Sequence, residues 1–147
     1  MTKNICVSDV VPLTTIDYPG ELAAVLFCQG CPWQCRYCYN TELIPAAKTC
    51  KYPWQKIIDF LHRRQGILDA VVFSGGEPLA QTSLAAAIAE VKALGFKIGL
   101  HTGGPYPRRL EQVLPLVDWV GFDVKTITTE YANVTQVKNS GKKAFES

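Results

Sequence analysis

Four cysteines lie within eleven residues, in the stretch CQGCPWQCRYCYN that covers residues 28–40. Thiols this close together can form disulfides, bind zinc, bind an iron–sulfur cluster or act as redox groups. Zinc sites commonly use two ligand pairs a dozen or more residues apart, whereas the two Cys-x2-Cys pairs here are separated by three residues. Closely spaced thiolates are typical of iron–sulfur clusters, so the spacing favours a cluster over zinc.

Cys28 differs from the other three cysteines because it ends the apolar run Leu22–Cys28. A side chain in phase with a buried strand points into the sheet, which leaves Cys31, Cys35 and Cys38 as the predicted metal ligands. Three thiolates on a four-iron cluster leave one iron without a protein ligand, and an open metal position is where chemistry takes place. With Cys28 as a fourth ligand, the loop would instead be a non-catalytic module that holds zinc or a cluster for structure or electron transfer.

The chain has 147 residues, enough for one hydrophobic core, and we predict a single domain over residues 1–147. Its 15 basic and 13 acidic residues are scattered, so no nucleic-acid partner is predicted. No apolar run approaches the roughly 20 residues that span a bilayer, and the N-terminus lacks a secretory signal, so we expect no membrane association and a cytoplasmic location. Disulfides are rare in that compartment, so Cys6 and Cys50 are expected to be free thiols.

Alternating apolar runs and amphipathic segments must position these cysteines. Runs typical of buried strands occur at Leu22–Cys28, Asp69–Ser74, Phe96–Leu100 and Val117–Val124, and they alternate with helical patterns from Pro53 to Gly66, at Leu84–Leu94 and from Pro107 to Leu114. A short helix is expected near residues 128–132, and the stretch NSGKKAFES (139–147) is typical of the start of another helix. This alternation predicts an α/β fold with a parallel sheet of about four βα units.

Polar or glycine-rich segments follow the predicted strands. The cysteine loop follows the first strand, Gly75-Gly76-Glu77-Pro78 the second and His101-Thr102-Gly103-Gly104 the third, while Asp123-x-Lys125 ends the fourth. Because the carboxyl ends of parallel strands meet at one edge of a sheet, we expect these segments to surround a single site. Asp123 lies on an apolar strand and is expected to be a buried carboxylate that needs a partner.

The Cys-x3-Cys-x2-Cys loop, with Tyr37 just before its last cysteine, resembles the signature of the radical S-adenosylmethionine superfamily. The segments DYPG at 17–20, FSGGEPL at 73–79 and VDWVGFDVK at 117–125 are similar to those of the anaerobic ribonucleoside-triphosphate reductase activating proteins, close relatives of the pyruvate formate-lyase activating enzymes. The resemblance runs from about Leu13 to Val137. It implies a partial (βα) barrel of which this chain supplies about four units, as a truncated chain, a naturally short member or half of a split protein, with an open sheet edge beside the last strand.

The resemblance implies two cofactors and a role for each predicted site residue. Cys31, Cys35 and Cys38 would hold a 4Fe-4S cluster whose fourth iron binds the amino and carboxylate groups of S-adenosyl-L-methionine. One electron from the reduced cluster would split a carbon–sulfur bond and yield methionine and a 5'-deoxyadenosyl radical. The remaining contacts to S-adenosylmethionine would come from Gly75, Gly76 and Glu77 at its amino group, from Tyr37 near its adenine, and from Thr102, Gly103, Asp123 and Lys125. The cofactors carry the chemistry, so no side chain is predicted to be catalytic.

Two residues depart from the pattern of the activating enzymes. His101 stands in place of an aspartate and Gly103 in place of an asparagine, so His101 is either a structural histidine or a cofactor contact. The implied function is that of an oxidoreductase that installs a glycyl radical on a partner enzyme, with anaerobic ribonucleoside-triphosphate reductase as the predicted partner. A flavodoxin- or ferredoxin-like protein would donate the electron. The alternatives are an activase of pyruvate formate-lyase and the non-catalytic metal or electron-transfer module.

Overall fold

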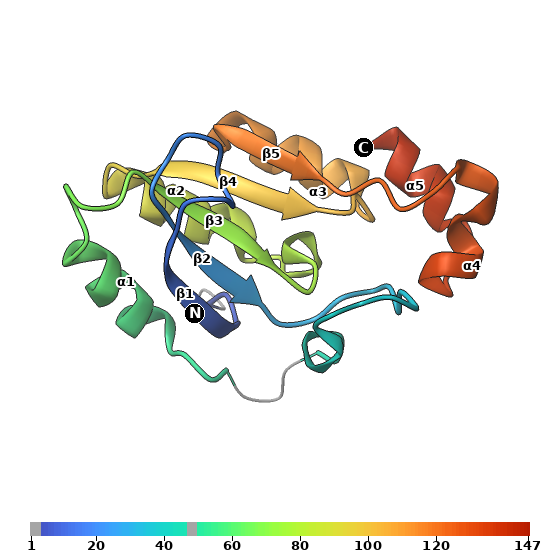
Figure 1. Ribbon diagram of the computed structural model, residues 1–147, viewed down its shortest axis with the longest axis horizontal. Helices are drawn as coiled ribbons and strands as arrows, with labels where there is room; N and C mark the ends of the chain where they lie inside the picture. Colours follow the sequence, from blue (N-terminus) through green and yellow to red (C-terminus); the bar gives the residue numbers. More distant parts are fainter. Residues whose placement is uncertain (1–3, 47–49) are drawn as a thin grey trace.

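A computed structural model describes residues 4–46 and 50–147 of the chain (Figure 1). Residues 1–3 and 47–49, which the single-domain prediction also covers, lie outside the described part. The strands are β1 (Val7–Thr14), β2 (Ala23–Cys28), β3 (Ala70–Gly75), β4 (Lys97–Thr102) and β5 (Trp119–Phe122). The helices are α1 (Trp54–His62), α2 (Leu84–Ala93), α3 (Pro107–Val113), α4 (Tyr131–Thr135) and α5 (Ser140–Glu146), with 3-10 turns η1 (Thr41–Leu43), η2 (Pro78–Ala80), η3 (Leu114–Leu116) and η4 (Thr128–Glu130).

The strands form one sheet in the order β1-β2-β3-β4-β5, in which each strand neighbours the next one along the chain. The pairs β2–β3, β3–β4 and β4–β5 are parallel, as the sequence predicts. This α/β arrangement, with strands in sequential order and helices between them, is that of a partial (βα) barrel. Within the described residues, β5 pairs only with β4, so the predicted open edge is present there.

Strand β1 was not predicted, and it pairs antiparallel with β2. Its sequence, VSDVVPLT, mixes apolar with polar residues and contains Pro12, so it forms no continuous apolar run. Proline lacks a backbone N–H and is tolerated at the edge of a sheet, where one side of the strand needs no partner. Because only part of β1 is buried, its signal was too weak to be recognised, and the sheet therefore has five strands instead of four.

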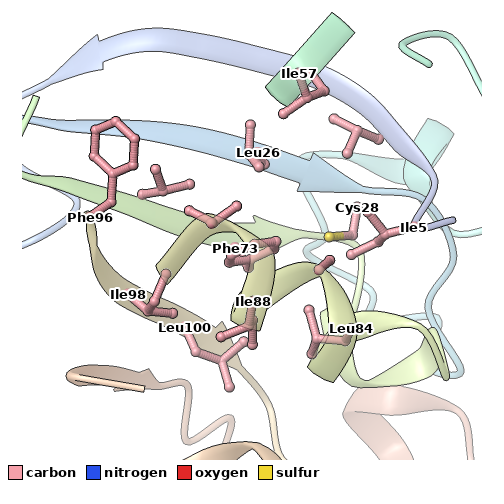
Figure 2. Packing of buried hydrophobic residues seen from close by; sticks show 14 of the residues in the cluster. Ile5, Leu26, Cys28, Ile57, Phe73, Leu84, Ile88, Phe96, Ile98 and Leu100 are labelled. Carbon is pink, nitrogen blue, oxygen red and sulfur yellow. The ribbon is translucent and has the colours of Figure 1, made fainter. Parts of the chain in front are cut away.

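The main core lies between one face of the sheet and helices α1, α2 and α3 (Figure 1). Leu26, Phe73 and Leu100 extend from β2, β3 and β4 toward Ile57 of α1 and Ile88 of α2 (Figure 2). Both helices present the apolar faces that their spacing predicts. Burying aliphatic side chains of this size stabilises a fold by about 1.5–3 kcal/mol each, so this layer holds the strand ends in place.

The chain after β5 forms helices whose pattern in the sequence is weak. The helix expected near residues 128–132 is the turn η4 followed by α4, and the stretch 139–147 contains α5. Tyr131 and Ala144 are buried and pack with Trp33 of the cysteine loop in a small separate cluster. Every helix among the described residues is too short or too polar to span a bilayer.

Cys6 and Cys50 form a disulfide, so the expectation of free thiols at these positions is wrong. The two residues are far apart in sequence, but Val7 at the start of β1 bridges to Tyr52, which brings the neighbouring cysteines together. This proximity depends on the unpredicted strand β1, so residue spacing could not reveal it. The other four cysteines, Cys28, Cys31, Cys35 and Cys38, are free.

Candidate functional site

The segments that follow β2, β3, β4 and β5 surround one cavity of about 530 Å³. Its lining includes every residue predicted for the cluster or the cofactor: Cys31, Cys35, Tyr37, Cys38, Gly75, Gly76, Glu77, Thr102, Gly103, Asp123 and Lys125. The sheet edge therefore brings all of the predicted positions together, although they come from four separate parts of the chain.

Cys31, Cys35 and Cys38 are free, half-buried thiols that line this cavity. Cys28 is fully buried in the main core, as its phase in β2 predicts (Figure 2). Burial raises the pKa of Cys28 far above that of an ordinary thiol. Burial also raises the pKa of Cys31, to about 11. In the described part of the chain, no three Cys, His, Asp or Glu side chains are arranged to hold a single metal ion.

The start of the cysteine loop is held by backbone hydrogen bonds to two other segments. Gly30 N–H donates to Leu43 O at 2.7 Å, and Cys31 N–H donates to Ile44 O at 2.9 Å. Glu77 N–H, after β3, donates to Gly30 O at 2.7 Å. Backbone donors and acceptors cannot move by side-chain rotation. These bonds therefore fix the position of Cys31 relative to the glycine-rich segment after β3.

The middle of the cysteine loop is held by α4 and the residues beside it. Gln34 N–H donates to Thr135 O at 2.9 Å, and Arg36 N–H donates to Val134 O at 3.2 Å. The side chain of Arg36 donates to Asn133 O, and the side chain of Gln136 donates back to Gln34 O at 2.8 Å. This support could not be predicted from the sequence, because backbone acceptors carry no residue-type signal.

Gly75 and Gly76 allow the end of β3 to approach the cysteine loop closely. A Cβ on Gly75 would lie 2.3 Å from the backbone nitrogen of Cys28, and one on Gly76 would lie 2.4 Å from the carbonyl oxygen of Gly30. Gly75 also has a φ of +116°, which other residues rarely adopt. The glycines are therefore needed for contact between two backbone segments, in addition to any contact with a ligand.

Glu77 is a carboxyl group buried at the cavity wall, 3% exposed. Its Oε1 accepts from Thr102 Oγ1 at 2.7 Å and from Leu79 N–H at 3.0 Å, and its Oε2 accepts from Gly103 N–H at 3.0 Å. Burial raises the pKa of Glu77 to about 7, although these hydrogen bonds act in the opposite direction. The side chain thus ties the ends of β3 and β4 together and changes its charge near neutral pH.

Asp123 is exposed, so the prediction of a buried carboxylate is wrong. Strand β5 ends at Phe122, earlier than predicted, and Asp123 already lies in the loop beyond it. The predicted partner is nevertheless present, because the ammonium group of Lys125 donates to Asp123. Lys125 Nζ also lies 5.6 Å from the centre of the Tyr37 ring, and its backbone N–H donates to the hydroxyl of Tyr131.

His101 lines the cavity, and both of its ring nitrogens contact protein groups. Nε2 lies 3.1 Å from the carbonyl oxygen of Asp17, which can only accept, so Nε2 carries a proton. Nδ1 lies 3.1 Å from Ser74 Oγ, and the ring packs edge-on against Trp119. His101 therefore connects the turn before β2 with the ends of β3 and β4, which is a structural role at the edge of the cavity.

Trp33 is a cavity residue that was not predicted from the sequence. It is 4% exposed, packs against Tyr131 and lies where a Cβ on Gly103 would come within 2.6 Å of its ring. Glycine instead of a larger residue at position 103 therefore leaves room for this indole. The only sequence signal was a large apolar residue within the cysteine loop.

Two solved structures resemble the fold. QueE from Escherichia coli matches with a TM-score of 0.58 at 16% identity, covering 69% of this chain and 54% of that one. A structure of TYW1 with a lysine-pyruvate adduct bound matches with a TM-score of 0.59 at 16% identity, covering 83% of this chain and 48% of that one. At these identities the similarity supports the α/β fold alone.

Curated relatives are more similar in sequence. A Methanocaldococcus jannaschii protein named "Putative glycyl-radical enzyme activating enzyme" is 35% identical over 142 residues, which cover 92% of this chain and 57% of that protein. The pyruvate formate-lyase-activating enzyme of Listeria monocytogenes is 28% identical over 139 residues, covering 84% of this chain and 54% of that enzyme. The chain thus spans about half the length of these relatives.

The family model of the radical SAM superfamily matches residues 25–147, a range that begins in β2 and includes all three cavity-lining cysteines. The same range contains the glycine-rich segment after β3 and the Asp123–Lys125 pair. With most of its length covered by this model and with the cysteine loop at the carboxyl edge of the sheet, the chain belongs to the radical SAM superfamily.

Proposed function

We propose that this chain is the cofactor-binding part of an enzyme that installs a glycyl radical on a partner protein. The first candidate for that partner is an anaerobic ribonucleoside-triphosphate reductase. The observation that carries the proposal is the arrangement of the cysteines: Cys31, Cys35 and Cys38 are free and line one cavity, while Cys28 is buried in the core. Three available thiols, and not four, suit a cluster with one open iron.

The residues at the cavity fit the two cofactors that the superfamily implies. Cys31, Cys35 and Cys38 would supply three sulfur ligands for a 4Fe-4S cluster, which suits the preference of iron–sulfur clusters for thiolates. Near them, Glu77 Oε2 accepts a single hydrogen bond, so it keeps a lone pair for the amino group of S-adenosylmethionine. When bound, the two cofactors together supply a carbon-centred radical for hydrogen abstraction, with the electron coming from a flavodoxin- or ferredoxin-like donor.

The side chains around the cavity would hold and orient these groups. A positive charge beside Glu77 would favour the carboxylate form, so an ammonium ligand and the Glu77 proton compete for the same place. Burial raises the pKa of the Cys35 thiol, and the positive charge of Lys125 opposes part of that rise, which would assist conversion to the thiolate. Tyr37 and Trp33 would offer ring surfaces to the adenosyl group.

Two partner enzymes are candidates for receiving the glycyl radical. Similarity of the segments at 17–20, 73–79 and 117–125 to reductase activating proteins supports the anaerobic reductase. The 28% identity to the pyruvate formate-lyase-activating enzyme of Listeria monocytogenes supports pyruvate formate-lyase as the second candidate. Anaerobic incubation of the reconstituted chain with each purified partner, S-adenosylmethionine and a reductant, followed by electron paramagnetic resonance, identifies the partner that acquires a glycyl radical.

The cluster itself is tested with two matched variants, Cys35→Ala and Cys28→Ala. Anaerobic reconstitution with iron and sulfide should give about four irons per chain in the unmodified protein and in Cys28→Ala, with a broad visible absorption. Cys35→Ala should lose both signals. Loss of iron in Cys28→Ala would instead support the non-catalytic module with four protein ligands. Iron retained in Cys35→Ala would contradict the proposed ligand set.

A further inference from the structure

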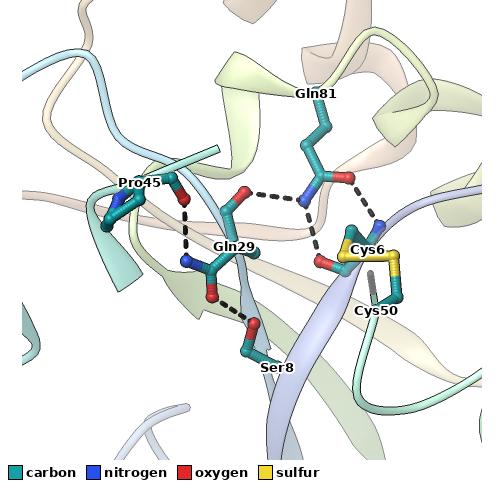
Figure 3. Close-up of a disulfide and its surroundings, with 6 residues drawn as sticks. All are labelled: Cys6, Ser8, Gln29, Pro45, Cys50 and Gln81. Carbon is teal, nitrogen blue, oxygen red and sulfur yellow. Dashed lines mark hydrogen bonds between the residues drawn. A yellow bond between two sulfur atoms is a disulfide. The ribbon is translucent and has the colours of Figure 1, made fainter. Parts of the chain in front are cut away.

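The Cys6–Cys50 disulfide lies at the surface next to the cysteine loop (Figure 3). Cys50 is exposed and Cys6 is half-buried. The bond joins residues 44 positions apart, and the covalent ring that it closes contains β1, β2 and all four free cysteines. The bond is therefore accessible to small thiols and at the same time constrains the segment that carries the predicted cluster ligands.

A hydrogen-bond network connects Cys6 directly with the residues before Cys31 (Figure 3). Cys6 O accepts from Gln29 N–H at 3.0 Å and from Gln81 Nε2 at 2.8 Å, and Cys6 N–H donates to Gln81 Oε1 at 2.6 Å. Gln81 Nε2 also donates to Gln29 O at 3.1 Å. Gln29 precedes Cys31 by two positions, so a displacement of Cys6 reaches the loop through one backbone hydrogen bond.

The other end of the disulfide is connected to the same place through residues 41–46, here called the return arm. Gln29 Nε2 donates to Glu42 O at 2.9 Å and to Pro45 O at 2.7 Å. Leu43 and Ile44 of the return arm accept the N–H groups of Gly30 and Cys31. Cys50 follows the return arm along the chain, so the disulfide limits how far the arm can move from β1.

We propose that Cys6 and Cys50 form a thiol–disulfide exchange site that controls how firmly the return arm holds Cys31. Intracellular disulfides are usually transient and redox-sensing, and an exposed cysteine residue beside a functional loop suits that use. The oxidised pair restrains the loop covalently. The reduced pair leaves it held by hydrogen bonds alone, so the loop opens more often.

The exchange uses a low-molecular-weight thiol as the reductant. Its thiolate attacks Sγ of the exposed Cys50, the Cys6–Cys50 bond breaks, and Cys6 leaves as a thiolate that takes up a proton. This leaves a mixed disulfide between Cys50 and the small thiol. A second small thiolate attacks the small-thiol sulfur of that mixed disulfide, which releases Cys50 as a thiolate and joins the two small thiols in a disulfide. Two electrons pass from the two small thiols to the protein, and the reverse sequence oxidises the pair.

The exchange site is tested first by differential alkylation and peptide mass spectrometry of the full chain. After incubation with oxidised glutathione, a peptide linked through Cys6 and Cys50 should be found, and reduced glutathione should convert both residues to alkylated thiols. Cys28 provides an internal reference for a buried thiol that the reagent does not reach without unfolding. Failure of the Cys6–Cys50 linked peptide to form under oxidising conditions overturns the exchange site.

The coupling to the loop is tested by amide hydrogen exchange of the two redox forms before any iron is added. The amides of Gly30 and Cys31 should exchange at least about tenfold faster in the reduced form, because they bond to the return arm. The amides of Gln34 and Arg36 bond to the α4 segment and should not change. Equal rates at Gly30 in both forms, or faster exchange at all four positions, overturn the coupling.

A double variant, with Cys6→Ala and Cys50→Ala together, should exchange like the reduced protein and should not respond to glutathione; a glutathione response in this variant would contradict the assignment. If the variant does not fold, the comparison of the two forms of the unmodified chain decides. The inference rests on the proposed function only in treating Cys31 as a cluster ligand. Because neither measurement requires iron or activity, failure of the cluster proposal and failure of the redox coupling give different results.

Discussion

Glu77 should make the stability of this protein depend on pH in a range where few other groups titrate. Its carboxyl group is buried, and burial raises its pKa from 4.5 to about 7. Between these values the folded chain binds a proton that the unfolded chain has released. The stabilisation is therefore complete below pH 4.5 and is lost as the pH rises to 7, and the two pKa values correspond to a loss of about 3 kcal/mol in the free energy of unfolding.

Replacing Glu77 with glutamine should remove this pH dependence, because an amide does not ionise. The substitution should also lower stability at pH 5 by about 1–3 kcal/mol. Three donors point at the two carboxyl oxygens, both of which can accept even when the group is protonated. The amide offers a single accepting oxygen, so either Gly103 N–H or the pair from Thr102 and Leu79 loses its acceptor. The substitution therefore replaces a pH-dependent loss in the free energy of unfolding with a loss that is the same at every pH.

Urea unfolding of the iron-free chain, followed by tryptophan fluorescence under anaerobic conditions from pH 4.5 to 7.5, measures both effects. Glu111→Gln is the matched control, since Glu111 is exposed on α3 and its replacement should keep the pH slope of the unmodified chain. A flat profile for the unmodified protein, or the same slope in Glu77→Gln, would refute the assignment of this titration to Glu77.

Two further substitutions test the support of the site. Gly76→Ala places a methyl group 2.4 Å from Gly30 O and should cost about 1–3 kcal/mol and prevent iron binding. Gly66→Ala meets no atom within 4 Å, although its φ of +76° strains the backbone, so this control should lose some stability but keep iron binding. An iron-loaded Gly76→Ala would contradict the close approach. Tyr131→Phe leaves the backbone N–H of Lys125 without its acceptor and should lower the free energy of unfolding by about 1–3 kcal/mol in the same urea assay, and an unchanged midpoint would argue against this bond.

The parts of the fold that could be predicted from sequence are those with a strong local pattern. Strands β2, β3 and β4 are largely buried apolar runs of a parallel sheet, and α1 has its apolar residues at helical spacing. Strand β5 was predicted as a buried run, but it is only half-buried because it lies at the edge of the sheet. Strand β1 could not be predicted because it is a half-exposed edge strand that contains Pro12. The Cys6–Cys50 bond depends on β1, so it was missed for the same reason.

The candidate site divides in a similar way. The order of strands and loops along the chain was enough to bring Cys31, Glu77 and Lys125 to one edge, since parallel strands all end on the same side of a sheet. That order did not determine the environment of each residue. Asp123 shows this, because the end of β5 lies one residue before it and leaves it exposed. Burial depends on where a strand stops and on what packs against it.

The sequence by itself determined the spacing of three thiols, the phase that turns Cys28 into the core and the order of the segments that meet at the cavity. These are properties of neighbouring residues and of chain order, so they follow from residue types and positions. The tertiary structure alone decided the hydrogen bonds from α4 to the cysteine loop, the raised pKa of Glu77 and the pairing of Cys6 with Cys50. Each of these depends on the distance between groups remote in sequence, and that distance exists only once the chain has folded.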